Sequence, residues 1–274
     1  GTMNIPDPRT VDFLINFLRE FFFITSKYYK LYNIEFMNKF FIYLTLVLFF
    51  SQQLAQSQNL KDKNVLIVWG GWEEHQPEKF SNIIESWLND ISANVRVENG
   101  LDIYSNYDEL MKFDLIIQSV TMSSIKPQQE KNLLKAIRDG VGFAGAHGGI
   151  VDSFRENTNY QFMTGGQWVE HPGGMVNFKV KIVQNDFTKG INDFEVFSEQ
   201  YYLHYDPNVE IVATTTFNGK DFPWINGVKM PVAWKKLYGN GKVFFISIGH
   251  DPGEFKRYKN GWELLKRGLV WAGS

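Results

Sequence analysis

Residues 64–91, NVLIVWGGWEEHQPEKFSNIIESWLNDI, contain a short apolar run followed by an amphipathic stripe. The apolar run at 64–71 ends in two glycines, as is typical of a strand buried on both faces of a parallel sheet. The stripe then places apolar side chains on one helical face: Phe80, Ile83, Ile84, Trp87, Leu88 and Ile91. A buried strand joined to such a helix predicts the first unit of an α/β fold.

The alternation of strand and helix continues as far as residue 146. Short apolar runs predict strands at 95–97, 113–120 and 141–146, and Pro127 begins a helix that carries Leu133, Leu134 and Ile137. Four strands that alternate with helices predict an α/β fold with a doubly wound, mainly parallel sheet, as in flavodoxin-like proteins.

The second half of the chain is richer in strand patterns. Strands are predicted at 176–183, 209–216, 232–234 and 242–248, before a closing helix that carries Trp262, Leu265 and Leu269. No linker rich in proline, glycine or serine divides this part of the sequence. We therefore expect residues 60–274 to form a single α/β domain with β-rich insertions.

Composition excludes several classes of protein. The 274 residues carry 28 basic and 30 acidic side chains, so the formal net charge is -2 and the basic excess of a nucleic-acid binder is absent. The chain has no cysteine, which excludes disulfides, thiolate metal sites and thiol nucleophiles.

The first part of the chain differs in composition, with ten of the 24 phenylalanines among residues 1–50. Residues 37–57 have the order of a signal peptide: Lys39, an apolar run at 40–50, and then small residues at 55 and 57. The apolar run spans about 16 Å as a helix, too short for a hydrocarbon core of about 30 Å.

We therefore expect export to the periplasm or the extracellular space, with no stable membrane span once the signal is removed. Residues 1–36 precede the signal and are interpreted as an upstream or non-native extension, outside the folded domain.

The five histidines are His75, His147, His171, His204 and His250. All except His171 follow a strand-like segment at or near its end. Ligands of open α/β sheets bind outside the carboxyl ends of the strands, so at least three of these imidazoles are expected to share one site.

His147 is the central residue of Gly145-Ala-His-Gly-Gly149, directly after a predicted strand. Small residues on both sides are typical of a sharp strand-to-helix elbow that presents its central side chain to a site. An imidazole there favours acid/base chemistry or metal binding. Residues 140–145 also match G-x-G-x-x-G, but the glycines lie before and inside the strand, which argues against a dinucleotide site.

Candidate roles follow from residue type. His147 and His250 are expected to transfer protons and Glu199 to orient or share the proton. Aromatic rings can stack on sugar faces and imidazoles can bind hydroxyls, so the expected substrate-binding residues are His75, Trp72, Trp168, His171, Tyr201 and His204. A divalent metal such as Zn²⁺ is an open alternative, with His75, His147, His171 and His250 as candidate ligands.

Five ordered segments carry a family resemblance: GGWEEH (70–75), GFAGAHGG (142–149), GGQWVEHPGG (165–174), SEQYYLH (198–204) and PVAWKKLYGNGKVFFISIGHDP (231–252). Over about residues 63–273 the chain resembles the ThuA-like (trehalose utilisation) family, which has the class I glutamine amidotransferase-like fold. The resemblance implies a role in carbohydrate utilisation and polar site positions at His75, His147, His171, Glu199, Tyr201 and His250. Because the chain has no cysteine, glutaminase chemistry is excluded.

The expected function is acid/base chemistry on a sugar or oxidised-sugar derivative, with hydrolysis, elimination and isomerisation left open. The alternative is a non-catalytic carbohydrate-binding or sensing protein that uses the same residues. Five histidines with carboxylates exceed what stacking and hydroxyl binding require, which favours an enzyme. The expected partner is a small-molecule carbohydrate, and a homodimer is an open possibility.

Overall fold

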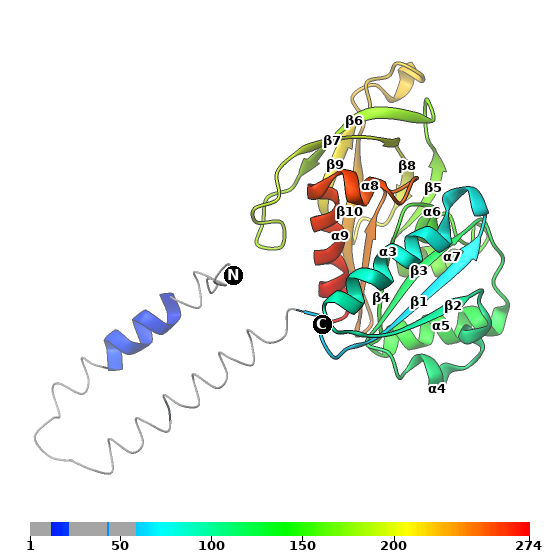
Figure 1. The fold of residues 1–274 in the computed structure, drawn as a ribbon. Coiled ribbons are helices and arrows are strands. Elements are labelled where there is room, and N and C mark those ends of the chain that lie inside the picture. The colour runs from blue at the N-terminus through cyan, green and yellow to red at the C-terminus, as the bar shows by residue number, and fades with distance from the viewer. Residues whose placement is uncertain (1–11, 22–42, 44–58) are drawn as a thin grey trace, which may run out of the picture. The chain divides into compact units, whose positions relative to one another are not determined.

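The computed structural model describes residues 12–21, 43 and 59–274, which belong to two units, residues 1–58 and 59–274 (Figure 1). In the first unit, residues 12–21 form a helix along which the rings of Phe13, Phe17 and Phe21 are stacked. The predicted signal peptide and the extension before it otherwise lie outside the described residues. Every helix that the structure describes is too short or too polar to span a bilayer.

The second unit is built on eleven strands within residues 59–274: β1 (Asn64–Gly71), β2 (Asn94–Asn99), β3 (Leu115–Thr121), β4 (Gly142–Ala146), β5 (Gly166–Glu170), β6 (Met175–Ile182), β7 (Phe194–Glu199), β8 (Tyr202–Tyr205), β9 (Glu210–Thr216), β10 (Lys229–Tyr238) and β11 (Gly241–Ile246). Nine form one sheet in the order β2-β1-β3-β4-β11-β10-β9-β6-β7, and β5 pairs with β8 separately. The five strands from β2 to β11 are parallel, which confirms the predicted α/β class.

Helices cover both faces of this sheet (Figure 1). Their bounds are α3 (Pro77–Asp90), α4 (Tyr107–Leu110), α5 (Pro127–Asp139), α6 (Gly148–Val151), α7 (Thr158–Thr164), α8 (Glu254–Arg257) and α9 (Lys259–Ala272), with 3-10 turns η1 (Glu73–His75), η2 (Asp102–Ser105) and η3 (Pro223–Ile225). Helices α3 and α9 bury their apolar stripes in one core, which includes Phe80, Ile84 and Leu265. Helix α5 packs into the core on the other face through Leu133 and Ile137. This arrangement is doubly wound.

The β-rich part of the chain extends the central sheet. Strands β10, β9, β6 and β7 join it with antiparallel pairing. Residues 166–170, for which the sequence predicts no strand, form β5, and the strand predicted at 232–234 is the longer β10. Pro231 interrupts the apolar pattern of β10, and the structure accommodates it beside a shift in register between Pro231 and Ala233.

The β6–β7 ribbon leaves the plane of the sheet. Only Lys181 and Ile182 of β6 pair with β9, whereas Met175 to Val180 pair with β7. The ribbon crosses the end of the molecule at which the parallel strands finish (Figure 1). As a result, Glu199 at the end of β7 reaches residues that follow β1, β4 and β11.

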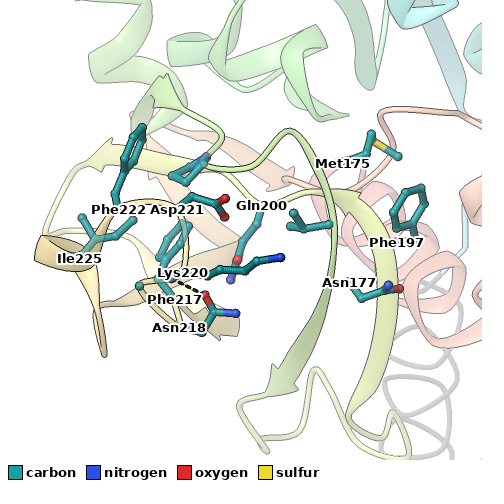
Figure 2. Close-up of a pocket in the computed structure, with 13 residues that line it drawn as sticks. Met175, Asn177, Phe197, Gln200, Phe217, Asn218, Lys220, Asp221, Phe222 and Ile225 are labelled. Atoms are coloured by element: carbon teal, nitrogen blue, oxygen red, sulfur yellow. Dashed lines mark hydrogen bonds between the residues drawn. The ribbon is translucent and has the colours of Figure 1, made fainter.

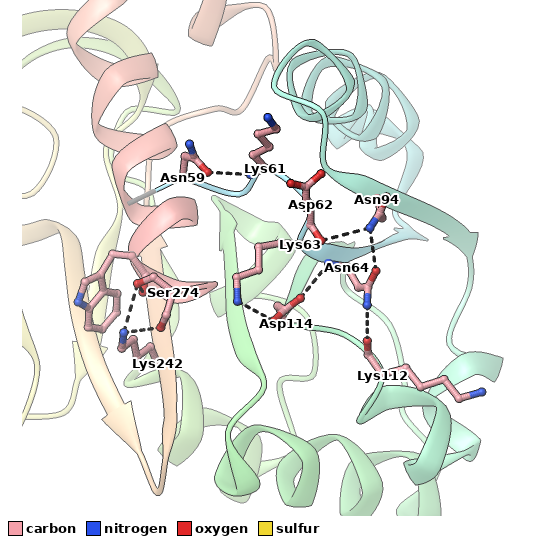
Figure 3. A network of polar contacts seen from close by, with 11 residues as sticks. Asn59, Lys61, Asp62, Lys63, Asn64, Asn94, Lys112, Asp114, Lys242 and Ser274 are labelled. Carbon is pink, nitrogen blue, oxygen red and sulfur yellow. Dashed lines mark hydrogen bonds and ion pairs between the residues drawn. The ribbon is translucent and has the colours of Figure 1, made fainter. Parts of the chain in front are cut away.

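A polar network ties the starts of β1, β2 and β3 together at the opposite end of these strands (Figure 3). Asp114 accepts hydrogen bonds from the Asn64 backbone N–H at 2.8 Å and from Lys63 Nζ at 2.9 Å. Asn64 in turn donates its side-chain amide to the Lys112 carbonyl at 3.1 Å. The Asp114 carboxylate therefore satisfies the first backbone N–H of β1.

Replacing Asp114 with alanine is expected to lower the free energy of unfolding by about 1–2 kcal/mol, because a strand N–H loses its charged acceptor. Lys63→Ala removes only the half-exposed ion pair and should cost about 0–1 kcal/mol. Urea denaturation of both variants checks the difference. Equal destabilisation by the two substitutions would contradict this role for Asp114.

Candidate functional site

Four side chains converge at the end of the molecule crossed by the β6–β7 ribbon. His75 comes from η1 after β1, His147 directly follows β4, Glu199 ends β7, and His250 lies in the loop after β11. The centroids of the three imidazole rings lie 4.8, 5.1 and 5.4 Å apart. One nitrogen or oxygen atom from each of the four residues lies within 4.8 Å of the others. We refer to these four residues as the Glu199 cluster.

His147 occupies the sharp turn between β4 and α6. Its φ of 54° and ψ of −142° are unusual for a residue with a Cβ, and such strain typically costs about 1–3 kcal/mol. Gly148 makes the turn possible, because a Cβ there would lie 2.8 Å from the ring of His75. This geometry is that of the predicted strand-to-helix elbow.

Both ring nitrogens of His147 face acceptor oxygens. Its Nδ1 lies 2.7 Å from the Ser247 carbonyl oxygen, and its Nε2 lies 3.0 Å from Oε2 of Glu199. A carbonyl and an ionised carboxylate have no proton to donate. A neutral imidazole can donate to only one of these two oxygens.

Glu199 is buried but ionised. Burial by itself raises the pKa of a carboxyl group, but the contacts with His147 and His250 outweigh it and hold the pKa of Glu199 well below its ordinary value. The imidazole charges act in the same direction. The cluster therefore surrounds a buried negative charge with nitrogen donors.

The pKa values of the other two imidazoles of the cluster are shifted in opposite directions. Burial, with the charges of His147 and His250 adding to it, lowers the pKa of His75 to about 3, so this ring is neutral at physiological pH. Its Nδ1 lies 3.2 Å from Thr121 Oγ1. His250 is half-buried, with Nδ1 3.3 Å from Glu199 Oε2, and its contact with this carboxylate raises its pKa.

Four more of the predicted site residues border the cluster. His171 Nε2 lies 3.9 Å from Glu199 Oε1, and the His171 ring centroid is 5.6 Å from that of Trp168. Trp72 is 39% exposed, beside His75. Tyr201 is buried and stacks on His147 with ring centroids 4.3 Å apart, so it supports that ring from within the protein.

His204 lies apart from this group. It is exposed on β8, where its backbone is paired with Gln167 of β5, while its neighbour Leu203 turns into the core. Proximity in sequence to Glu199 and Tyr201 suggested a shared site. The alternation of side chains along β8 directs His204 to solvent instead.

Several supporting groups were not predicted. Thr121 ends β3 and contacts His75, and the Ser247 carbonyl contacts His147. Glu254 is fully buried and accepts hydrogen bonds from the backbone N–H groups of Gly249 and Asp251, so it holds the loop of His250. Thr121 could have been found as a polar residue at the end of a predicted strand, whereas the backbone partners leave no signal in the sequence.

Two of the three glycines of the G-x-G-x-x-G match, Gly142 and Gly145, serve packing. A Cβ on Gly142 would lie 2.1 Å from the Ala272 carbonyl oxygen of α9, and one on Gly145 would lie 2.3 Å from the Gln118 carbonyl oxygen. These glycines let β4 approach its neighbours closely.

A pocket of about 340 Å³ adjoins the segments that carry His171 and Glu199 (Figure 2). It lies between the β6–β7 ribbon and the segment that connects β9 to β10. Its lining combines aromatic with polar side chains: Phe197, Phe217, Phe222, Asn177, Asn218, Lys220 and Asp221. Pro172 and Gln200 also line it, and they directly follow His171 and Glu199 in the sequence.

Comparisons with known proteins identify relatives of this fold. A ThuA-like protein from Bacteroides uniformis is 15% identical with a TM-score of 0.63, over 78% of this chain and 91% of that one. One from Parabacteroides merdae is 14% identical with a TM-score of 0.60, over the same shares. A β-galactosidase from Bacillus circulans sp. alkalophilus is 12% identical with a TM-score of 0.51, over 77% of this chain and 31% of that one.

No match was found among curated proteins. The family model for ThuA, described as trehalose utilisation, matches residues 64–272 and thus all of the main sheet. ThuA-like proteins have a glutamine amidotransferase-like fold, in agreement with the architecture of this chain. The chain belongs to the ThuA (trehalose utilisation) family.

Proposed function

We propose that this protein catalyses an acid/base reaction on a sugar or oxidised-sugar derivative. The observation that carries the proposal is a buried, ionised carboxylate in contact with two imidazoles at the strand ends of an α/β sheet. Membership of the trehalose utilisation family supports carbohydrate as the substrate class. Glutamine amidotransfer is excluded because the chain has no cysteine.

The roles follow from the contacts of each side chain. His147 and Glu199 form a proton-transfer pair, since Nε2 and Oε2 lie 3.0 Å apart. His250 shares Oε2 of Glu199 and is exposed enough to meet a substrate. Neutral His75 binds a hydroxyl or carbonyl group. A divalent metal at the same residues would assist this chemistry by polarising a substrate oxygen.

The surroundings of the cluster suit a carbohydrate. Trp72 and Trp168 provide ring faces against which the C–H groups of a sugar can pack, and the guanidinium of Arg155 lies 4.5 Å from the Trp168 ring. The neighbouring pocket offers amide, ammonium and carboxylate groups beside aromatic rings, which allows it to hold a second sugar unit.

Loss of the His147 imidazole is expected to reduce turnover by about 10²–10⁴-fold, because the proton-transfer pair is broken. Wild type and His147→Ala would be incubated with a panel of disaccharides, glycosides and their keto derivatives, with products followed by NMR. His250→Ala provides a second test at a half-exposed position where folding is not at risk. Unchanged turnover in both variants, with unchanged melting temperatures, would contradict the proposal.

The same panel separates the enzyme from a binding protein. If sugars bind at the cluster without any conversion, the carbohydrate-binding or sensing function replaces the enzymatic one.

We also propose that the protein is exported, on the signal-like pattern of residues 37–57. N-terminal sequencing of the mature protein tests this. A start close to residue 58 is expected, and a start near Met3 would contradict export.

A further inference from the structure

We infer that the Glu199 cluster is a binding site for a divalent metal ion of the zinc class. The ligands are one nitrogen each from His75, His147 and His250 and one oxygen from Glu199. The inference deepens the proposed function. Only the use of the metal in catalysis rests on that function, and metal binding does not. The site itself is argued from the donor atoms.

The first argument is that two imidazole nitrogens face one carboxylate oxygen without enough N–H groups to donate to it. Oε2 of Glu199 lies 3.0 Å from His147 Nε2 and 3.3 Å from His250 Nδ1. His147 already directs Nδ1 to the Ser247 carbonyl, so as a neutral ring it has only a lone pair to offer to Glu199. His250 Nδ1 is buried and has no hydrogen-bond partner among residues 59–274. A cation between these atoms satisfies all of them at once.

The second argument is spacing. Zinc in proteins is bound by nitrogen and oxygen at about 2.0–2.2 Å in a tetrahedron, which places neighbouring ligand atoms about 3.3–3.6 Å apart. The two measured separations from Glu199 are 3.0 and 3.3 Å, and all four donor atoms lie within 4.8 Å of one another. The two shorter separations are close to those between neighbouring ligands of a tetrahedral zinc site.

The third argument is that two of the histidine ligands are oriented by contacts on their other ring nitrogen. Contacts of Nδ1 with the Ser247 carbonyl and with the Thr121 hydroxyl orient His147 and His75, so Nε2 is the nitrogen of each ring that remains to bind a metal. Outer hydrogen bonds of this kind are typical of metal-binding histidines. Three imidazoles with one carboxylate suit zinc and similar transition metals, whereas magnesium and calcium prefer oxygen ligands.

This ligand set differs from the one expected from the sequence. Glu199 takes the place that was assigned to His171, whose Nε2 is 3.9 Å from Oε1 of Glu199. His171 is therefore the nearest imidazole outside the set.

The test is a titration of the full-length, tag-free protein with Zn²⁺ after dialysis against a chelator, followed by calorimetry. One Zn²⁺ per chain is expected. His75→Ala and His250→Ala should each lower the affinity by more than about 100-fold, because loss of an outer hydrogen bond alone costs about 10–100-fold. His204→Ala is the matched control, since it removes an exposed imidazole outside the cluster, and it should bind like the wild type.

Substitution with Co²⁺ gives a second readout that does not depend on activity. A tetrahedral site is expected to show strong visible absorption in the wild type and in His204→Ala, and to lose it in His75→Ala. Absence of stoichiometric binding, or equal binding by all four proteins, would overturn the metal site. Zinc binding without conversion of any sugar would overturn the proposed function alone, and full turnover by metal-free protein that binds no zinc would overturn the metal site alone.

Discussion

Glu199→Gln is expected to reduce turnover by about 10²–10⁴-fold while the protein stays folded. Glutamine keeps the size of the side chain but has no negative charge, and its NH₂ group donates where the carboxylate accepted. His147 and His250 both face Oε2 of Glu199, so an amide nitrogen at that position removes the acceptor of both imidazoles, and an amide oxygen there accepts without the negative charge. The substitution also removes the only anionic member of the proposed metal site.

Steady-state kinetics on the sugar derivative that the wild type converts would measure this effect, with the melting temperature as a check of folding. Glu195→Gln is a matched control on the same strand, because Glu195 is exposed and is paired across the ribbon with Lys179. A loss smaller than about threefold in Glu199→Gln would show that the carboxylate does not take part in the reaction. A zinc titration of the same variant shows whether lost activity accompanies a lost metal ion.

The parallel half of the sheet could be predicted from the sequence because its strands are buried on both faces. Residues 65–69 and 115–117 are apolar without interruption, and Pro77 and Pro127 are the first residues of α3 and α5. Strands β5 and β8 have four or five residues and carry exposed polar side chains. Their pairing depends on contacts with the rest of the fold, which no local pattern contains.

The convergence of three histidines could be predicted for a similar reason. Parallel strands end at the same edge of a sheet, so residues that follow β1, β4 and β11 meet there. The place of Glu199 could not be derived in this way, since it depends on the β6–β7 ribbon bending away from β9. The exposure of His204 depends on its register in β8, where a shift by one residue would turn it inward.

The largest effect on stability is expected at the ion pair between Lys236 and Asp206, beside the two-stranded sheet of β5 and β8. Lys236 of β10 is 4% exposed, and its ammonium group donates to Asp206 Oδ2 at 2.6 Å and to the Phe162 carbonyl. Asp206 also accepts from the Asn208 N–H and donates its own N–H to the Gly165 carbonyl. The pair therefore joins β10 to the segments on either side of β5 and β8.

Asp206→Ala is expected to lower the free energy of unfolding by about 3 kcal/mol, because it leaves the Lys236 charge buried without a partner. The value lies at the lower end of the usual range of about 3–5 kcal/mol for broken buried pairs, since the Asp206 side chain is 18% exposed. Asp206→Asn combined with Lys236→Met should recover most of the loss. Lys135→Ala, which breaks an exposed pair with Asp139, should leave the melting temperature unchanged.

The pH dependence of the destabilisation by Asp206→Ala shows whether the charge of Asp206 is its cause. The hydrogen bond from Lys236 holds the pKa of Asp206 below its ordinary value, so the carboxylate stabilises the fold above the unfolded-state pKa of about 3.9. The difference in unfolding free energy between wild type and Asp206→Ala should be constant from about pH 8 to pH 5. It should then shrink as the pH falls through the lowered pKa and Asp206 takes up a proton. A difference that stays constant in acid would mean that Asp206 acts through packing and backbone hydrogen bonds, because only the charged pair is lost on protonation.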